Sequence, residues 1–246
     1  NETAALTAFT ATLTGATSVT LTASDSTWSV TGSDLTTALA DGVFLLGTLT
    51  VTDIASGNET AALTAFTATT TGATSVTLTA ADGTWSVATA DLATALTADV
   101  RFAGALTVTG IANGNEAAAL TAYTSATTGA ASVTLTASDT VWSVSAADLT
   151  TALAAGVRFA GTLTVTDIAA GDETAALTAF TATTTGATSV TLTASDSTWS
   201  VAGSALTTAL ADGVFLLGAL TVTDIASGNE TAALTAFTAT LTGATS

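Results

Sequence analysis

The chain is one segment repeated every 57 residues. The pair Asn1-Glu2 returns at residues 58, 115, 172 (as Asp-Glu) and 229, so each step is 57 residues (58 minus 1, and so on), and one tryptophan keeps the same spacing. Such self-similarity is the signature of a repeat architecture, in which each unit packs on its neighbours. We therefore expect a single uncapped array over 1–246, with copies 1–57, 58–114, 115–171 and 172–228 and a partial copy 229–246.

Each copy has two similar halves, and each half predicts a strand followed by a helix. From Val19 the chain reads VTLTASDSTWSVTGSDLTTALADG, and from Leu49 it reads LTVTDIASGNETAALTAF. Both halves open with apolar residues alternating with Thr, which is typical of a half-buried strand. Helical spacing follows, with Leu35 and Leu39 in the first half and Leu63, Phe66 and Thr70 in the second.

Polar and glycine residues mark the expected helix ends. Ser56 with Glu59 three residues later predicts a capping box, and Ser33-Asp34 predicts a polar cap with an acidic first turn. Gly42 and Gly72 stand where each helix should stop.

These elements predict an α/β solenoid with two strand–helix turns per repeat. A strand, a helix and a parallel strand cross over right-handed almost always, so repetition at fixed length gives one continuous parallel sheet. Val19 and Leu21 should point inward and Thr20 and Thr22 outward, which favours helices on one side of the sheet only. A pure right-handed parallel β-helix, with the Ala-rich segments extended, is the alternative.

The composition excludes several kinds of function. Thr (62) and Ala (57) make up about half of the chain, and His, Cys, Met, Pro and Lys are absent. Nucleophile triads and His/Cys zinc sites are thereby removed, and we expect no enzyme. With two Arg against 19 acidic residues the net charge is −17, which disfavours nucleic acid. Polar residues interrupt every apolar stretch, so we expect no membrane insertion.

The repeat also resembles a known family. The pattern LTVTD-x5-E-x3-L-x2-F, followed by TSVTLTASDSTWSVTGSDLTTAL, is similar to the tandem repeats of very large secreted bacterial surface proteins. The positions that carry the likeness are Val19, Leu21, Asp25, Leu35, Leu39, Asp53 and Leu63. The resemblance implies an acidic, exported chain of the adhesin, sheath or surface-layer type, often dependent on calcium.

A column of aspartates suggests a metal. These residues follow the strands at intervals of about 28 residues, with Gly110 interrupting them: Asp25, Asp53, Asp82, Asp139, Asp167, Asp196 and Asp224. On stacked turns they would line one sheet edge, where Ca²⁺ would relieve the repulsion between carboxylates. The alternative is that each Asp only caps a turn.

Three other features have both a functional and a structural interpretation. The threonines Thr20, Thr22, Thr48, Thr50 and Thr52 would form a flat solvent-facing array, which could bind ice or polysaccharide, although Thr also simply favours strands. Trp28 and its equivalents are expected in the core rather than in a sugar-stacking stripe. Arg101 and Arg158 replace Phe at a position that should lie at the surface.

The sequence therefore predicts a structural role. We expect a repeat region of an extracellular, cell-surface or filament protein that acts as spacer, sheath or adhesin stalk. Self-association or continuation of the same array would supply its partner. The alternative is a ligand-binding solenoid that uses the Thr face for ice or polysaccharide.

Overall fold

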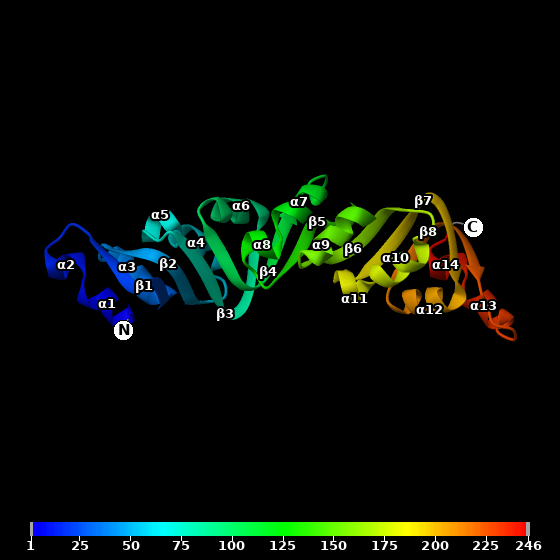
Figure 1. Ribbon diagram of the computed structural model, residues 1–246, viewed down its shortest axis with the longest axis horizontal. Coiled ribbons are helices and arrows are strands. Elements are labelled where there is room, and N and C mark those ends of the chain that lie inside the picture. The colour runs from blue at the N-terminus through cyan, green and yellow to red at the C-terminus, as the bar shows by residue number, and fades with distance from the viewer. Residues whose placement is uncertain (1, 245–246) are drawn as a thin grey trace. The chain divides into compact units, whose positions relative to one another are not determined.

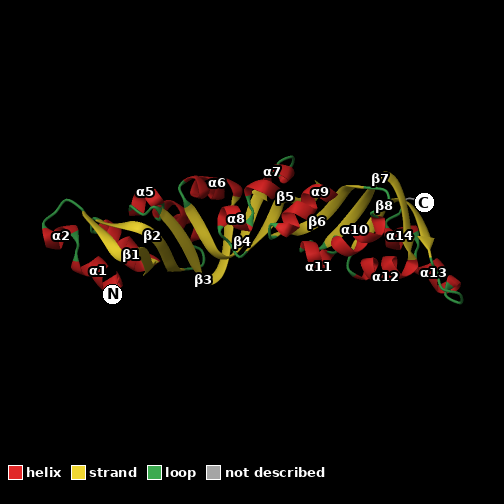
Figure 2. Cartoon of the chain, in the orientation of Figure 1, coloured by secondary structure: helices red, strands yellow, loops and turns green. Residues whose placement is uncertain are grey.

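Strands and helices alternate along the whole described chain. The computed structural model describes residues 2–244, and Figures 1 and 2 show the alternation. The chain divides into two compact units, one of residues 1–109 with 125–133 and one of residues 110–124 with 134–246. None of the helices among residues 2–244 is long and apolar enough to cross a membrane.

The strands form one parallel sheet in which spatial order follows chain order, from β1 to β8. The strands are β1 (Val19–Thr31), β2 (Val43–Ile54), β3 (Ser75–Ala88), β4 (Val100–Ile111), β5 (Ser132–Ser145), β6 (Val157–Ile168), β7 (Ser189–Ala202) and β8 (Val214–Thr223). Helices connect them, so the architecture is of the α/β solenoid kind. The pure β-helix alternative is wrong, because the Ala-rich segments are helical.

One nine-residue helix follows each odd-numbered strand: α3 (Gly32–Ala40), α6 (Thr89–Thr97), α9 (Ala146–Ala154) and α12 (Gly203–Ala211). A pair of shorter helices precedes each odd-numbered strand and comes after β8: α1 (Glu2–Ala8) with α2 (Ala11–Thr14), α4 (Glu59–Ala65) with α5 (Ala68–Thr71), α7 (Glu116–Ala122) with α8 (Ser125–Thr128), α10 (Glu173–Ala179) with α11 (Ala182–Thr185), and α13 (Glu230–Ala236) with α14 (Ala239–Thr242).

The helix after the second strand is broken, which the sequence pattern did not predict. We expected Leu63, Phe66 and Thr70 on one helix, but α4 ends before Phe66 and α5 begins after Thr67. Thr67 is extended (φ −87°, ψ 164°), and it forms a reciprocal capping box with Thr70. Threonine side chains that bond nearby backbone groups compete with a continuous helix, which explains the break.

The expected capping box at Ser56 and Glu59 is also wrong. Asn58 is the N-cap of α4, and the Glu59 carboxylate instead accepts a hydrogen bond from the Gly57 N–H at 2.7 Å. At α3 the cap is Thr31, two residues before the predicted Ser33, and it accepts a hydrogen bond from the Asp34 N–H. Asp34 lies in the first turn, as predicted.

The strands do not all pair over the same length. β1, β3 and β7 each pair with the following strand along two stretches, whereas β2 and β6 pair with the following strand only through their later halves. β1 pairs with β2 in two stretches, Val19–Thr22 with Val43–Leu46 and Thr27–Thr31 with Thr48–Thr52. Between them four residues of β1 bulge opposite Gly47. β2 then pairs through its later half with the beginning of β3, from Thr48–Ser75 to Ile54–Ala80. That ladder ends before the second half of β3, and α4 also packs against β3.

The core lies on one face of the strands, as the alternation predicted. In β3, Val76 and Leu78 are fully buried, while Thr77 and Thr79 on the opposite face are half-buried. Trp85 continues the buried row after the bulge. In the first strand, Val19 and Leu21 are half-buried rather than buried. The helices contribute Leu35 and its equivalents, which are fully buried.

Candidate functional site

The aspartates inside the odd-numbered strands form turns at the bulge. The Asp25 Oδ1 accepts a hydrogen bond from the Thr27 N–H at 3.0 Å, and Asp82, Asp139 and Asp196 make the equivalent bond. The residue between acceptor and donor has a positive φ, as Ser26 does at 59°. These backbone bonds lower the pKa of the Asp25, Asp82 and Asp196 carboxyls, because they stabilise the charged form.

The aspartates at the ends of the even-numbered strands have a different backbone role. Asp53, Asp167 and Asp224 adopt φ values of 56°, 60° and 53°. Gly110, which interrupts the column, has φ 71°. Asp tolerates this left-handed region better than most residues and Gly adopts it freely, so the backbone conformation explains both residue types.

The register separates the two sets of aspartates. Asp25 lies in the bulge before the Thr27–Thr48 pair, whereas Asp53 follows the Thr31–Thr52 pair at the other end of the same ladder. Where β2 pairs with β3, Asp53 precedes Ile54, and Ile54 pairs with Ala80, which is two residues before Asp82 in the sequence. The expected single row is therefore not formed. No group of three or more acidic side chains that could hold a metal occurs within residues 2–244. Calcium binding stays a prediction.

One carboxylate of the bulge set reaches a neighbouring loop. The Asn113 side-chain amide donates to the Asp139 Oδ2 at 3.4 Å, which joins the loop after β4 to the bulge of β5. Ser56 stands at the equivalent position in the first copy. Loop and bulge are thus adjacent, and polar side chains can bridge them without a cation.

The predicted threonine face divides into two parts. The first part, Thr20 and Thr22, pairs with Phe44 and Leu46, so it does not continue into the second part. In the second part the hydroxyl residues form rows across strands. These rows are Thr27–Thr48–Ser75 and Ser29–Thr50–Thr77, with Thr31–Thr52 beyond them. Thr48 is exposed and Thr50 and Thr52 are half-buried.

The tryptophans are core residues, as predicted. Trp28, Trp85, Trp142 and Trp199 are at most 5% exposed. Each indole Nε1 donates to a main-chain carbonyl of the next strand, as Trp85 does to Ala103 at 3.2 Å. Trp85 also meets Phe102 edge to face with ring centroids 5.2 Å apart. A sugar-stacking stripe of tryptophans is therefore wrong.

Both arginines lie half-buried, and their guanidinium groups bond the backbone. The Arg101 Nη1 donates to the carbonyls of Val100 and Leu96, at 2.9 and 3.4 Å, and Arg158 repeats this with Val157 and Leu153. Leu96 and Leu153 lie in the last turns of α6 and α9, where a positive charge is favourable.

A groove that the sequence did not predict occurs at two matching places, where the first copy meets the second and where the fourth copy meets the partial copy. The first groove has a volume of about 340 Å³ and separates the start of α3 from α4. Its apolar walls include Ile54 and Phe66, and its polar side chains include Ser33, Asp53 and Asn58. Gly32 opens it: a Cβ built there would meet the Phe66 and Ile54 side chains at 3.5 and 3.6 Å.

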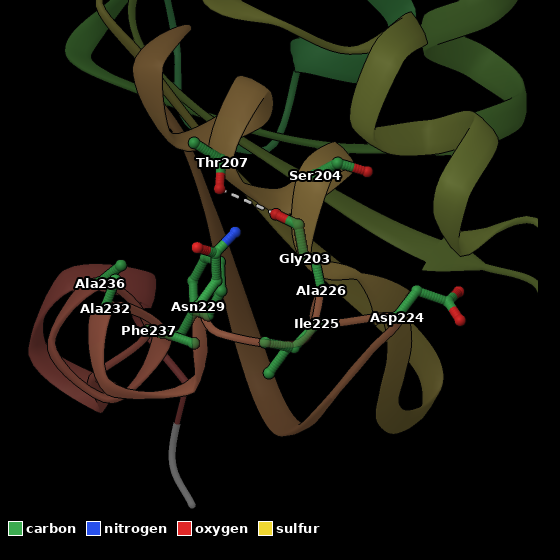
Figure 3. A pocket seen from close by; sticks show the side chains of 11 residues that line it. Gly203, Ser204, Thr207, Asp224, Ile225, Ala226, Asn229, Ala232, Ala236 and Phe237 are labelled. Atoms are coloured by element: carbon green, nitrogen blue, oxygen red, sulfur yellow. Dashed lines mark hydrogen bonds between the residues drawn. The ribbon is translucent and has the colours of Figure 1, made fainter.

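The equivalent groove in the fourth copy has a volume of about 380 Å³. In Figure 3 the Asn229 amide points toward Gly203 and Thr207, whereas the Asp224 carboxylate points away from them. The Thr207 hydroxyl is already bonded to the Gly203 carbonyl at 2.8 Å. The sequence signal for these grooves is glycine at the first helical position, where the second and third copies have Thr89 and Ala146.

Comparison of the chain with protein-family models, with curated proteins and with solved structures gives no match.

Proposed function

We propose that this chain is a structural array, with two strand–helix turns per 57-residue repeat and helices on one side of the sheet. Its role is that of a spacer, sheath or adhesin stalk in an extracellular bacterial surface or filament protein. The likeness of the sequence to secreted surface repeats supports the location. The observation that carries the structural role is that each turn buries side chains of its neighbours.

Two residues show this burial by neighbours. Phe66 packs over Gly32 and Ile54 of the preceding turn and is 6% exposed, whereas the equivalent Phe9 is 52% exposed. Leu177 is 1% exposed, whereas the equivalent Leu234 is 79% exposed. Phe9 would be buried by a preceding turn and Leu234 by a following one. A further copy of the repeat, from the same array or from a second molecule, would supply those turns.

Sedimentation of the purified polypeptide 1–246 over a range of concentrations tests this proposal. We expect concentration-dependent association end to end, because the exposed Phe9 and Leu234 surfaces lose contact with water. The variants Phe9→Asp and Leu234→Asp should reduce association. Leu46→Asp is the control, because Leu46 is 46% exposed on the open sheet face. A monomer at every concentration, or equal effects of all three variants, contradicts the proposal.

A second candidate function uses the hydroxyl rows. Thr27, Thr48 and Ser75 form a row across three strands, and rows of hydroxyls on a rigid sheet suit polysaccharide or ice. Thermal hysteresis and retention on insoluble polysaccharides test the two ligands. Thr48→Val, which removes one exposed hydroxyl at similar volume, should weaken either activity, and unchanged activity contradicts the use of this row.

A further inference from the structure

The grooves and one sequence motif occur together in the repeat. Gly32 of the first copy is followed by the triplet Asn58-Glu59-Thr60 at the start of the second copy, and Gly203 of the fourth copy is followed by Asn229-Glu230-Thr231 at the start of the partial copy. A third such triplet is Asn1-Glu2-Thr3. Asn-x-Thr is the acceptor motif of N-linked glycosylation in secreted chains. The motif therefore stands beside each of the two grooves.

At the other two boundaries between copies, the glycine and the complete triplet are both missing. Thr89 replaces the glycine in the second copy, and the triplet that follows it, Asn115-Glu116-Ala117, lacks the hydroxyl residue. Ala146 replaces the glycine in the third copy, and Asp172 replaces the acceptor asparagine that follows it. The chain thus contains its own controls, in which the same backbone carries a broken motif.

The acceptor side chains are placed for modification. Asn58 and Asn229 are exposed N-cap residues, and neither side chain makes a capping hydrogen bond to its helix. Thr60 and Thr231 are also exposed. Asn58 and Asn229 line the two grooves, and the Asn229 amide points across its groove toward Gly203 (Figure 3).

We propose that Asn58 and Asn229 are N-glycosylation acceptors and that the first sugar of each glycan lies in the adjoining groove. In the transfer, the asparagine amide nitrogen bonds to C1 of the sugar. The bond from C1 to the lipid-linked pyrophosphate breaks, the pyrophosphate lipid leaves, and the amide gives up one proton. The inference rests on the proposed extracellular location and on an export route that carries out N-glycosylation, since transfer occurs during export; it does not rest on the bacterial assignment.

The groove suits an N-acetylated hexosamine. Its volume of about 340 Å³ lies at the small end of the range for ligand sites. Ile54 and Phe66 offer apolar contact to a ring face. The Thr36 hydroxyl, which donates to the Gly32 carbonyl at 2.7 Å, can still accept a hydrogen bond from a sugar hydroxyl. In the second copy Thr89 replaces this glycine, and its hydroxyl donates to the Thr109 carbonyl at 2.8 Å.

The acceptor test exports the chain with an added signal peptide through the secretory pathway of cultured eukaryotic cells, in an Asn1→Gln background that removes the third triplet, Asn1-Glu2-Thr3. Intact mass and peptide mapping should show N-glycans at Asn58 and Asn229 and none at Asn115. Thr60→Ala should abolish the first glycan while leaving Asn58 in place, and Ala117→Thr should create one at Asn115. Unmodified Asn58 and Asn229 in the secreted protein overturn the acceptor proposal. That result leaves the array proposal intact, because sedimentation tests the latter.

The groove test compares two enzymatically trimmed forms of the same protein. One keeps a single sugar on each acceptor, and the other is amidase-treated, which leaves Asp, the residue that stands naturally at 172. The single-sugar form should melt about 2 °C or more higher. Gly32→Thr with Gly203→Thr should remove this difference without removing the glycans. A difference that persists in the double variant overturns the placement of the sugar in the groove.

Discussion

Gly47 is the residue at which one added methyl group should damage the repeat most. It has φ 121° and lies opposite the bulge of β1, so an added Cβ would overlap the Ser26 carbonyl oxygen and lie 2.8 Å from the Ser26 carbonyl carbon. The backbone strain alone costs about 1–3 kcal/mol. Moving Ser26 to relieve the overlap also disturbs the bond from the Trp28 Nε1 to the Leu46 carbonyl, which contributes about 1 kcal/mol. Gly47→Ala should therefore lower the free energy of unfolding by about 3 kcal/mol or more.

Gly57→Ala is the matched control for this change. Gly57 also has a positive φ, of 88°, but nothing lies within 4 Å of an added Cβ. Only strain remains, so the expected loss is about 1–2 kcal/mol. Urea unfolding followed by circular dichroism, with hydrogen exchange of the β1 and β2 amides, measures both variants. Equal losses for Gly47→Ala and Gly57→Ala would refute the reasoning, because the steric overlap would then contribute nothing.

The remaining predictions concern the core, proteolysis, metal and pH. Trp85→Ala should cost about 3–5 kcal/mol in urea unfolding, because it removes a buried ring and leaves the Ala103 carbonyl unpaired; a loss below 1 kcal/mol would contradict its place in the core. Trypsin should leave the native protein uncut over hours and give three fragments after denaturation, since Arg101 and Arg158 lie half-buried within strands. If Ca²⁺ bridges the aspartates, EDTA should lower the melting temperature, and identical melting with and without EDTA excludes the metal. The pKa of the Asp82 carboxyl is lowered in the folded state, so its contribution to stability is full above about pH 4 and disappears as the pH falls further. The melting temperature of Asp82→Asn should therefore fall less steeply than that of the unchanged protein as the pH is lowered.

The alternation of strand and helix could be predicted because local patterns determine it. Val76 and Leu78 are buried and Thr77 and Thr79 are not, as a two-residue period requires for a sheet with one covered face. The burial of tryptophan followed from its size in a chain with few other large apolar residues. Gly42 and Gly72 follow the helices with φ values of 71° and 81°, as expected of helix ends.

The register could not be predicted, because it depends on pairs of residues from different turns. Thr20 and Thr48 have the same alternation in sequence, yet Thr20 meets Phe44 whereas Thr48 meets Thr27. The four-residue bulge opposite Gly47 produces this difference. A signal for it does exist in the sequence: a glycine recurs at 47, 104, 161 and 218, inside an otherwise β-branched and apolar strand. Glycine within a strand marks a bulge or a close backbone approach, and here it marks both.

The acidic column shows why a repeated residue type is weak evidence for a repeated ligand. In a tandem repeat every backbone requirement recurs with the period, so residues that satisfy a turn are repeated as faithfully as residues that bind. Asp53 and Gly110 share little chemistry that would suit a cation, but both allow the positive φ of that position. At the other acidic position, Asp82 precedes Gly83 and Asp196 precedes Ser197, and both second residues have positive φ while the Asp accepts the same backbone bond. Gly32 is different, because Thr89 and Ala146 replace it in other copies; the period does not explain it, and it points more directly to function than Asn58 or Thr60, which recur in most copies.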